Sequence, residues 1–178
     1  FPFLNGLIDQ IIVLFDQMNA SGLQFAAAAH ITQCEAHIDG EFPTHYAIQL
    51  MTSGSMYFDR EGCRSVSVCQ PIFFWTELSS HYRYGPGDTG SWNHHFVTFR
   101  GGLADSLYLP ILEKIAPHGY CPVSAVGDME AAFLQLIRFA QDSLCNWDGR
   151  IHALHRVLYI ARESQQIGQD VPDTRLQK

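Results

Sequence analysis

The chain has 178 residues, of which 47% are hydrophobic and 12% aromatic, so it can bury the apolar core of one compact domain. Its formal net charge of −7 makes it unsuited to bind DNA phosphates, which require a basic surface. No apolar run approaches the roughly 18 residues of a membrane-spanning helix, and the N-terminal residues lack the basic segment of a signal peptide. We therefore expect no membrane partner.

The cysteines indicate the cellular compartment. They are odd in number and include no Cys-x-x-Cys pair: Cys34, Cys63, Cys69, Cys121 and Cys145. A disulfide framework or a zinc knuckle needs paired spacings, so we expect reduced, mostly buried thiols in a cytoplasmic protein.

The first 22 residues carry apolar side chains at helical spacing. Apolar residues recur three or four positions apart between residues 4 and 18, which predicts a helix that ends in the turn-forming residues 19–22. A buried strand over residues 11–15 is the alternative interpretation.

Between residues 23 and 102, short apolar runs alternate with turn-forming residues, a pattern typical of β-strands joined by turns. We expect strands over residues 25–34, 46–50, 56–58, 65–69, 72–75, 81–84 and 92–99. Turn-forming residues separate them, most clearly at 53–55, 59–62 and 85–88. Strands of this number and spacing predict a sandwich or a small barrel, and a small barrel can hold one ligand.

Residues 103–166 return to helical spacing. We expect a short helix over residues 104–112 and two antiparallel helices over residues 126–144 and 150–165. The first of the two long helices places Leu144 on its apolar face. The polar residues 167–178 are typical of a linker.

Four segments carry residues at characteristic offsets. Residues 92–101 read W-N-H-H-F-V-T-F-R-G, residues 46–56 run from an apolar strand into Ser-Gly-Ser, and residues 81–84 read H-Y-R-Y. Residues 171–178 read V-P-D-T-R-L-Q-K. The first segment resembles the pattern W-x-H-x-[WF]-[VI]-x-F-R-G of the ligand-sensing domain of bacterial AraC-type transcription regulators. The last resembles the opening of their helix-turn-helix domain.

The resemblance implies a fold class and a function. The fold is mainly β with C-terminal helices: a cupin-like jelly-roll barrel at residues 23–102, then a helical dimerisation region at residues 103–166. A small-molecule effector, such as a sugar or a related metabolite, would bind in the barrel. It would control DNA binding by a C-terminal domain that follows the linker and is not in this sequence. The resemblance also implies a homodimer, no enzymatic activity and no cofactor.

The candidate ligand-binding residues begin on the segment that carries the strongest resemblance. Alternate residues of a strand share a face, so Trp92, His94 and Phe96 lie on one side. The resemblance implies that His94 and Phe96 face into the barrel, where an imidazole and an aromatic ring suit a small polyhydroxylated ligand. The alternative is a His94 that is hydrogen-bonded by neighbouring strands and contacts no ligand.

Further candidates lie on neighbouring segments. Either His81 or the pair Tyr82 and Tyr84 faces into the barrel, depending on a strand register that the sequence does not fix. Trp75 and His45 are additional candidates for the ligand-binding set.

The sequence predicts neither a metal site nor an enzyme. Metal-binding cupins use a His-x-His pair, which does not occur here, and His94 and His95 are adjacent and face opposite sides of their strand. There is no G-x-S-x-G elbow and no glycine-rich phosphate loop. A stand-alone cupin-type enzyme, such as a metal-dependent isomerase or dioxygenase, is the alternative function. A dimerisation unit with a filled barrel is a third.

The last predicted helix carries an apolar seam. Ile151, Leu154, Leu158 and Ala161 follow one another three or four residues apart, a spacing typical of coiled coils. The resemblance implies a symmetric two-fold contact along this seam. The alternative is that the seam is buried within one subunit.

Overall fold

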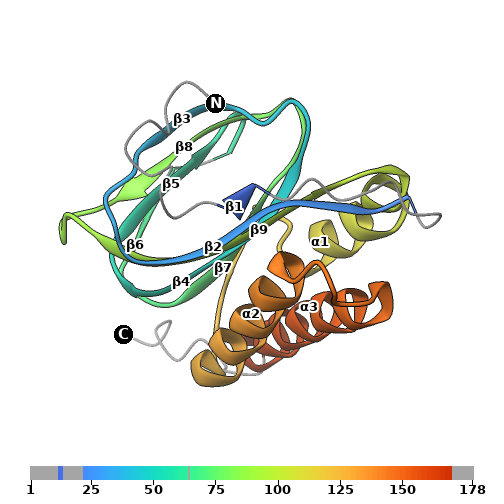
Figure 1. The fold of residues 1–178 in the computed structure, drawn as a ribbon. Coiled ribbons are helices and arrows are strands. Elements are labelled where there is room, and N and C mark those ends of the chain that lie inside the picture. The colour runs from blue at the N-terminus through green and yellow to red at the C-terminus, as the bar shows by residue number, and fades with distance from the viewer. Residues whose placement is uncertain (1–11, 14–21, 64, 170–178) are drawn as a thin grey trace.

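A computed structural model describes residues 12–13, 22–63 and 65–169 (Figure 1). Two antiparallel β-sheets face each other, and helices cover the outer side of one of them. The strands are β1 (Ile12–Val13), β2 (Gln24–Cys34), β3 (Ile38–Glu41), β4 (Tyr46–Gly54), β5 (Met56–Arg60), β6 (Val66–Val68), β7 (Ile72–Thr76), β8 (His81–Pro86), β9 (Trp92–Arg100) and β10 (Tyr120–Pro122). The helical elements are the π-helical turn η2 (Ala104–Tyr108), α1 (Leu109–Ile115), α2 (Val126–Gln141) and α3 (Trp147–Gln169).

The strand order is that of a jelly roll. One sheet has the order β1-β2-β9-β4-β7-β10 and the other has the order β3-β8-β5-β6. From β2 to β9 the chain passes back and forth between the sheets, and the neighbouring strands are antiparallel. Without the added edge strands β1 and β10, the two facing sheets have four strands each, β2-β9-β4-β7 and β3-β8-β5-β6, which is the double Greek key of a jelly roll. The prediction of a mainly β, cupin-like jelly roll with C-terminal helices is therefore confirmed.

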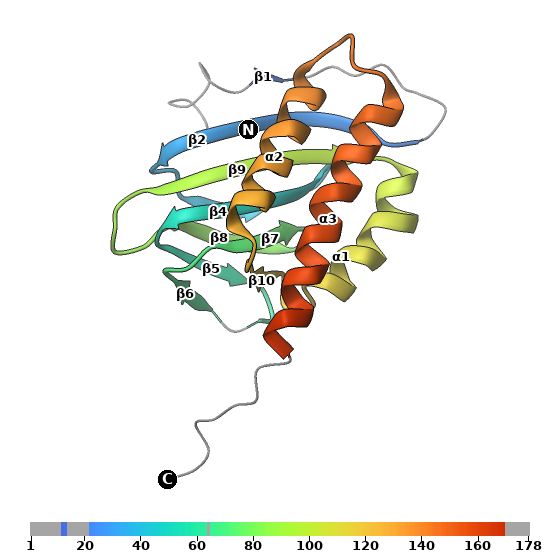
Figure 2. The same ribbon diagram turned by 90° about the horizontal axis from the view of Figure 1, so that it is seen from below.

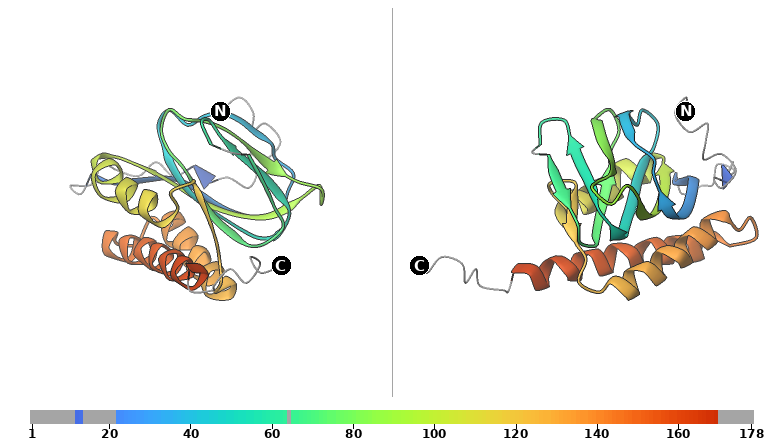
Figure 3. Two further views of the ribbon diagram at one scale, coloured as in Figure 1. Left: turned by 180° about the vertical axis from the view of Figure 1, so that it is seen from behind. Right: turned by 90° about the vertical axis from the view of Figure 1, so that its left-hand side faces the viewer.

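The helices lie against the outer face of the six-stranded sheet (Figures 2 and 3). Helix α2 contacts β2, β9 and β4, and it runs antiparallel beside α3, which also contacts α1 and β10. The helical hairpin predicted after the barrel is therefore present. None of the described helices combines the length and the apolar character that a membrane crossing requires.

Alternation along the six-stranded sheet divides the apolar side chains into two cores. Residues that face the other sheet, among them Met51 and Phe74, fill the barrel interior. Their neighbours Leu50 and Phe73 face the helices and pack with them. Consecutive residues of a strand point to opposite sides, so a strand buried on both faces serves both cores. This explains why the predicted strands are almost continuously apolar.

Two helix boundaries differ from the prediction. Helix α2 ends at Gln141, and Leu144, which was expected on its apolar face, is 92% exposed. Helix α3 begins at Trp147, inside a segment expected to be a turn. The side-chain oxygen of Asn146 accepts a hydrogen bond from the backbone N–H of Gly149 at 2.8 Å, which caps the first turn and allows the earlier start.

The C-terminal end of α3 also extends beyond the prediction. The helix continues to Gln169 and so includes the first residues of the segment expected to be a linker. The rest of that segment, residues 170–178, lies outside the described residues.

The helix predicted over residues 4–18 lies almost wholly outside the described residues. Ile12 and Val13 are described, and they form β1, paired antiparallel with Ala28 and Ala27 of β2. The helix prediction is wrong at these two residues, where the alternative of a strand is observed because β1 hydrogen-bonds to the edge of the sheet.

The cysteines are less buried than expected, although all are free thiols. Cys34 and Cys121 are buried, Cys145 is partly buried, and Cys63 and Cys69 are exposed. The two exposed thiols flank β6, the short strand at the edge of the four-stranded sheet.

Gly101 ends the W-N-H-H-F-V-T-F-R-G segment at a position that excludes a side chain. Its φ is +112°, and a Cβ there would overlap the backbone carbonyl oxygen of Gly22. We expect Gly101→Ala to lower the free energy of unfolding by more than about 2 kcal/mol, because backbone strain and steric overlap add. Urea denaturation measures the loss. Gly90→Ala is the control, since Gly90 has a φ of +72° but open space around its Cβ. Equal losses in the two variants would contradict the role of the overlap.

Candidate functional site

The barrel interior contains the β9 residues that carry the sequence resemblance. Trp92 and His94 are 2% and 7% exposed, and their rings stack with centroids 4.0 Å apart. The Phe96 ring centroid lies 5.3 Å from that of His94, and Phe96 is partly buried against the interior cluster. These three residues share the inner face of the strand, as alternation requires.

His94 is held between strands by a hydrogen bond and by ring contacts. Its Nε2–H donates to the side-chain oxygen of Gln49 on β4 at 2.9 Å. Its ring also stacks on Phe74 of β7, with centroids 6.2 Å apart. Burial, with smaller contributions from His95 and His30, lowers the pKa of His94 to about 3. The imidazole is therefore neutral at pH 7.

Strand β8 directs its tyrosines into the barrel. Tyr82 and Tyr84 are buried in the interior cluster, and the Tyr84 ring meets that of Trp92 edge-on with centroids 6.4 Å apart. The pairing of β8 with β3 and β5 decides the register that the sequence left open. His81 consequently faces outward.

Two buried N–H groups of the interior have no hydrogen-bond partner: Nε2 of Gln49 and Nε1 of Trp92. Burial raises the pKa of the Tyr84 hydroxyl and of the Cys34 thiol, and contacts with Gln49 and Trp92, respectively, oppose these shifts. The Tyr84 hydroxyl and the Cys34 thiol are therefore the neighbouring acceptors of these two N–H groups. Buried donors are normally paired. The interior thus offers two poorly paired N–H donors beside a neutral imidazole.

Three of the predicted ligand-binding residues lie outside the barrel interior. Trp75 faces the helices and donates from Nε1 to the carbonyl oxygen of Ala116 at 2.9 Å. His81 lies on the outer surface of the four-stranded sheet, with Nε2 3.1 Å from the Asp39 carboxylate. His45 precedes β4, at the opposite end of that strand from the stacked rings. Strand alternation and register separate these residues from the interior, so we leave them out of the ligand-binding set.

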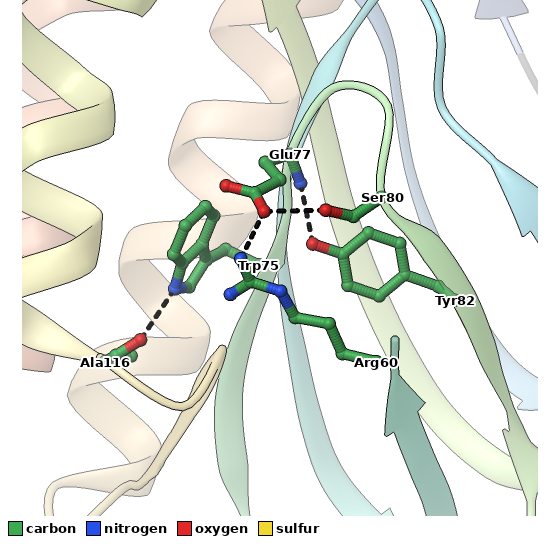
Figure 4. Close-up of polar contacts among 6 residues, drawn as sticks. All are labelled: Arg60, Trp75, Glu77, Ser80, Tyr82 and Ala116. Carbon is green, nitrogen blue, oxygen red and sulfur yellow. Dashed lines mark hydrogen bonds and ion pairs between the residues drawn. The ribbon is translucent and has the colours of Figure 1, made fainter. Parts of the chain in front are cut away.

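A polar cluster that no sequence pattern indicated lies at the end of the barrel where β5 and β7 finish and β8 starts (Figure 4). Glu77 forms an ion pair with Arg60 and accepts a hydrogen bond from Ser80 Oγ at 2.7 Å. The backbone N–H of Glu77 donates to the hydroxyl oxygen of Tyr82 at 3.0 Å. The Arg60 guanidinium lies 5.4 Å from the centre of the Trp75 ring, a cation–π contact. The cluster joins the two sheets at this end of the barrel.

The apolar seam of α3 is buried within the subunit. Leu154 and Ala161 are completely buried, Leu158 is 5% exposed, and Ile151 packs partly against the same core. The helix must cover the apolar outer face of the sheet, and the seam residues provide that cover. The structure therefore shows the intrasubunit alternative for this seam. The exposed side of α3 carries Tyr159, which is 63% exposed.

The barrel interior contains groups that can bind a small molecule. Its polar groups are a neutral imidazole, an amide, an indole N–H and two phenols, which form hydrogen bonds and stack on flat molecules. Sequence reasoning found Trp92, His94 and Phe96 but missed Gln49 and Phe74. A glutamine inside the apolar run 46–50 was the available signal, because a polar residue buried in a strand needs a partner.

Comparison with known proteins finds structures that share the fold only at low TM-scores and low sequence identity. The sequence matches no protein-family model and no curated protein sequence. The structure is similar to the cupin domain of Cnp3 from Schizosaccharomyces pombe, with a TM-score of 0.38 and 7% identity over 56% of this chain and 69% of that chain. It is also similar to YhaK from Escherichia coli, with a TM-score of 0.42 and 6% identity over 51% of this chain and 44% of that chain. For KdgF from Halomonas sp. the TM-score is 0.34 and the identity 11%, over 50% and 78% of the two chains. Scores this low carry no functional inference, and the fold assignment rests on the strand order.

Proposed function

We propose that this chain is the effector-sensing domain of a cytoplasmic, bacterial AraC-type transcription regulator. The effector is a small polar molecule, such as a sugar or a related metabolite, that binds in the barrel interior. The observation that carries this proposal is the buried polar group formed by His94 and Gln49, next to the poorly paired N–H donors of Gln49 and Trp92. A ligand with acceptor oxygens pairs these donors, and the surrounding rings cover its apolar faces.

The position of this group also supports a regulatory role. Phe42, Phe96 and Tyr120 are the partly exposed rings packed against the interior cluster, so a ligand enters where one of them is displaced. Strand β9 lines the barrel with one face and contacts α2 with the other. A ligand that prefers one arrangement of β9 therefore also favours one arrangement of the helix layer. The C-terminal helix then carries that preference toward the DNA-binding domain.

A homodimer is part of the proposal, although it cannot use the buried seam. The exposed sides of α2 and α3 carry Leu134 and Tyr159, which are 42% and 63% exposed. We place the two-fold contact on this surface, because exposed aromatic and aliphatic side chains are typical of subunit interfaces.

A thermal-shift screen with sugars and small polar metabolites tests effector binding. An effector present at about 100 times its Kd should stabilise the folded protein by about 2.7 kcal/mol. For a chain of this size, that gain raises Tm by about 5 °C or more. His94→Ala and Gln49→Leu should each reduce the shift, measured against the Tm of the same variant without ligand.

His152→Ala is the matched control, since His152 is exposed on α3 and should leave the shift unchanged. A shift that persists in both interior variants would place the ligand elsewhere. If no compound raised Tm, the domain would instead be a dimerisation unit with a filled barrel.

The regulator assignment has a separate test in the full-length gene product. We expect the chain to continue past Lys178 into two helix-turn-helix units. A stop codon directly after Lys178 would contradict the regulator assignment. It would not affect the result of the thermal-shift screen for effector binding.

A further inference from the structure

Helix α2 crosses the outer face of strands β2 and β9 (Figure 2), and two histidines meet on that face of the six-stranded sheet. His30 of β2 and His95 of β9 are directly opposite each other across the antiparallel strands. Their rings lie parallel, with centroids 3.9 Å apart and an interplanar angle of 7°. Asn93 holds the His30 ring by a hydrogen bond of 2.7 Å between its side-chain oxygen and Nε2. The two imidazoles are therefore fixed side by side.

Helix α2 adds a carboxylate to this pair. Glu130 Oε1 lies 3.5 Å from His95 Nε2, and one potential ligand atom from each of His30, His95 and Glu130 lies within 4.8 Å of the other two. Zinc–ligand bonds of about 2.0–2.2 Å place two ligand atoms of a tetrahedral site about 3.4 Å apart. The His95–Glu130 separation already fits that geometry, and the stacked His30 and His95 rings must rotate out of parallel for both to bind one ion.

His95 gives an independent indication of a ligand. Its side chain is fully buried, and neither ring nitrogen makes a well-aligned hydrogen bond, although buried ring nitrogens are normally paired. The backbone of Leu50 and the Glu130 carboxylate are its polar neighbours.

We propose that His30, His95 and Glu130 bind a divalent transition-metal ion of the Zn²⁺ type. Two imidazoles and one carboxylate suit Zn²⁺, whereas Ca²⁺ and Mg²⁺ require more oxygen ligands. Three protein ligands leave the fourth position of the ion to water or to an added ligand. The side chain of Glu130 is 34% exposed, which gives the ion a route from solvent.

The ion joins β2, β9 and α2, three elements that are far apart in the sequence. Its binding should stabilise the folded state and attach the helix layer to the sheet. The site lies on the opposite face of β9 from His94, so it is separate from the barrel interior. Metal binding and effector binding can therefore succeed or fail independently.

A titration with Zn²⁺ alone tests the metal site. Isothermal titration calorimetry of the chelator-treated protein should show one ion bound per chain, and Tm should rise with Zn²⁺. Glu130→Gln and His30→Gln should each weaken Zn²⁺ binding by at least about tenfold, because even the loss of an outer-shell partner costs about 10- to 100-fold. Co²⁺ offers a second readout, since the visible absorption of the tetrahedral ion should be lost in both variants.

Two variants control for charge and for surface histidines. Asp128→Asn removes a carboxylate from the exposed first turn of α2, and His152→Gln removes an exposed imidazole from α3. Both should bind Zn²⁺ as the unaltered protein does. Neither His30 nor Glu130 is fully buried, and circular dichroism verifies that their variants fold. Equal Zn²⁺ affinity in all four variants, or no stoichiometric binding by the unaltered protein, would overturn the proposal.

Discussion

Leu154→Asp is expected to leave the chain largely unfolded. Leu154 is completely buried in the core between the helices and the six-stranded sheet. Removing a leucine from such a position costs about 2–5 kcal/mol, and burying a carboxylate among apolar side chains adds several kcal/mol more. The sum is comparable with the total stability of a domain, about 5–15 kcal/mol. Far-UV circular dichroism and urea denaturation measure the loss.

His152→Asp on the same helix is the matched control. His152 is exposed, so its replacement should change the free energy of unfolding by about 0.5 kcal/mol or less. The two variants also distinguish the two interpretations of the seam. A Leu154→Asp protein that stayed folded and only lost its partner subunit, by light scattering, would show that the seam is an intersubunit contact.

Acid should destabilise the protein steeply, in measurements made with a chelator present. Burial lowers the pKa of His94 to about 3 and that of His95 to about 4, whereas a histidine in the unfolded chain titrates near 6.5. Below pH 6.5 the unfolded chain therefore binds more protons than the folded one, so the free energy of unfolding falls as pH falls. This contribution is fully present above about pH 6.5. At pH 5 each ring lowers the free energy of unfolding by about 2 kcal/mol relative to neutral pH, and the two rings together lower it by about 4 kcal/mol.

Urea denaturation at a series of pH values from about 7.5 to about 4.5 checks this expectation. His94→Gln should remove roughly half of the loss between pH 6.5 and 5, because it removes one of two similar rings. His152→Gln should keep the full loss, because His152 is exposed in the folded protein. An unchanged pH dependence in His94→Gln would show that this ring is protonated in the folded protein as easily as in the unfolded one.

The barrel was predictable because strands and turns leave local signals. The apolar runs and the turns between them located most of β2 to β9, and the resemblance of residues 92–101 indicated how the strands are arranged. The short strands β3 and β10 were missed, because each contains turn-forming residues such as Gly40 and Pro122. Their pairing with β8 and β7 forms them, and that pairing has no local signal.

The candidate site was predictable only along single strands. Alternation placed Trp92, His94 and Phe96 together, whichever strands lie beside them. It could not show that β8 turns its tyrosines inward, or that Trp75 faces the helices. Those orientations depend on register, and a shift of one residue reverses every side chain of a strand.

The expectation that no metal binds used spacing along one strand, where His94 and His95 do point to opposite sides. The metal site that we propose combines residues from other elements: His30 from the neighbouring strand and Glu130 from a helix.

Periodicity and turn-forming residues are local properties of the chain. The amino-acid sequence alone was therefore sufficient to predict the main strands, the long helices and which residues lie on the same face of a strand. Which strands pair, and which side of α3 meets the sheet, depends on contacts between distant segments. Only the folded chain therefore brings His30 beside His95 and buries Leu154 within its own subunit.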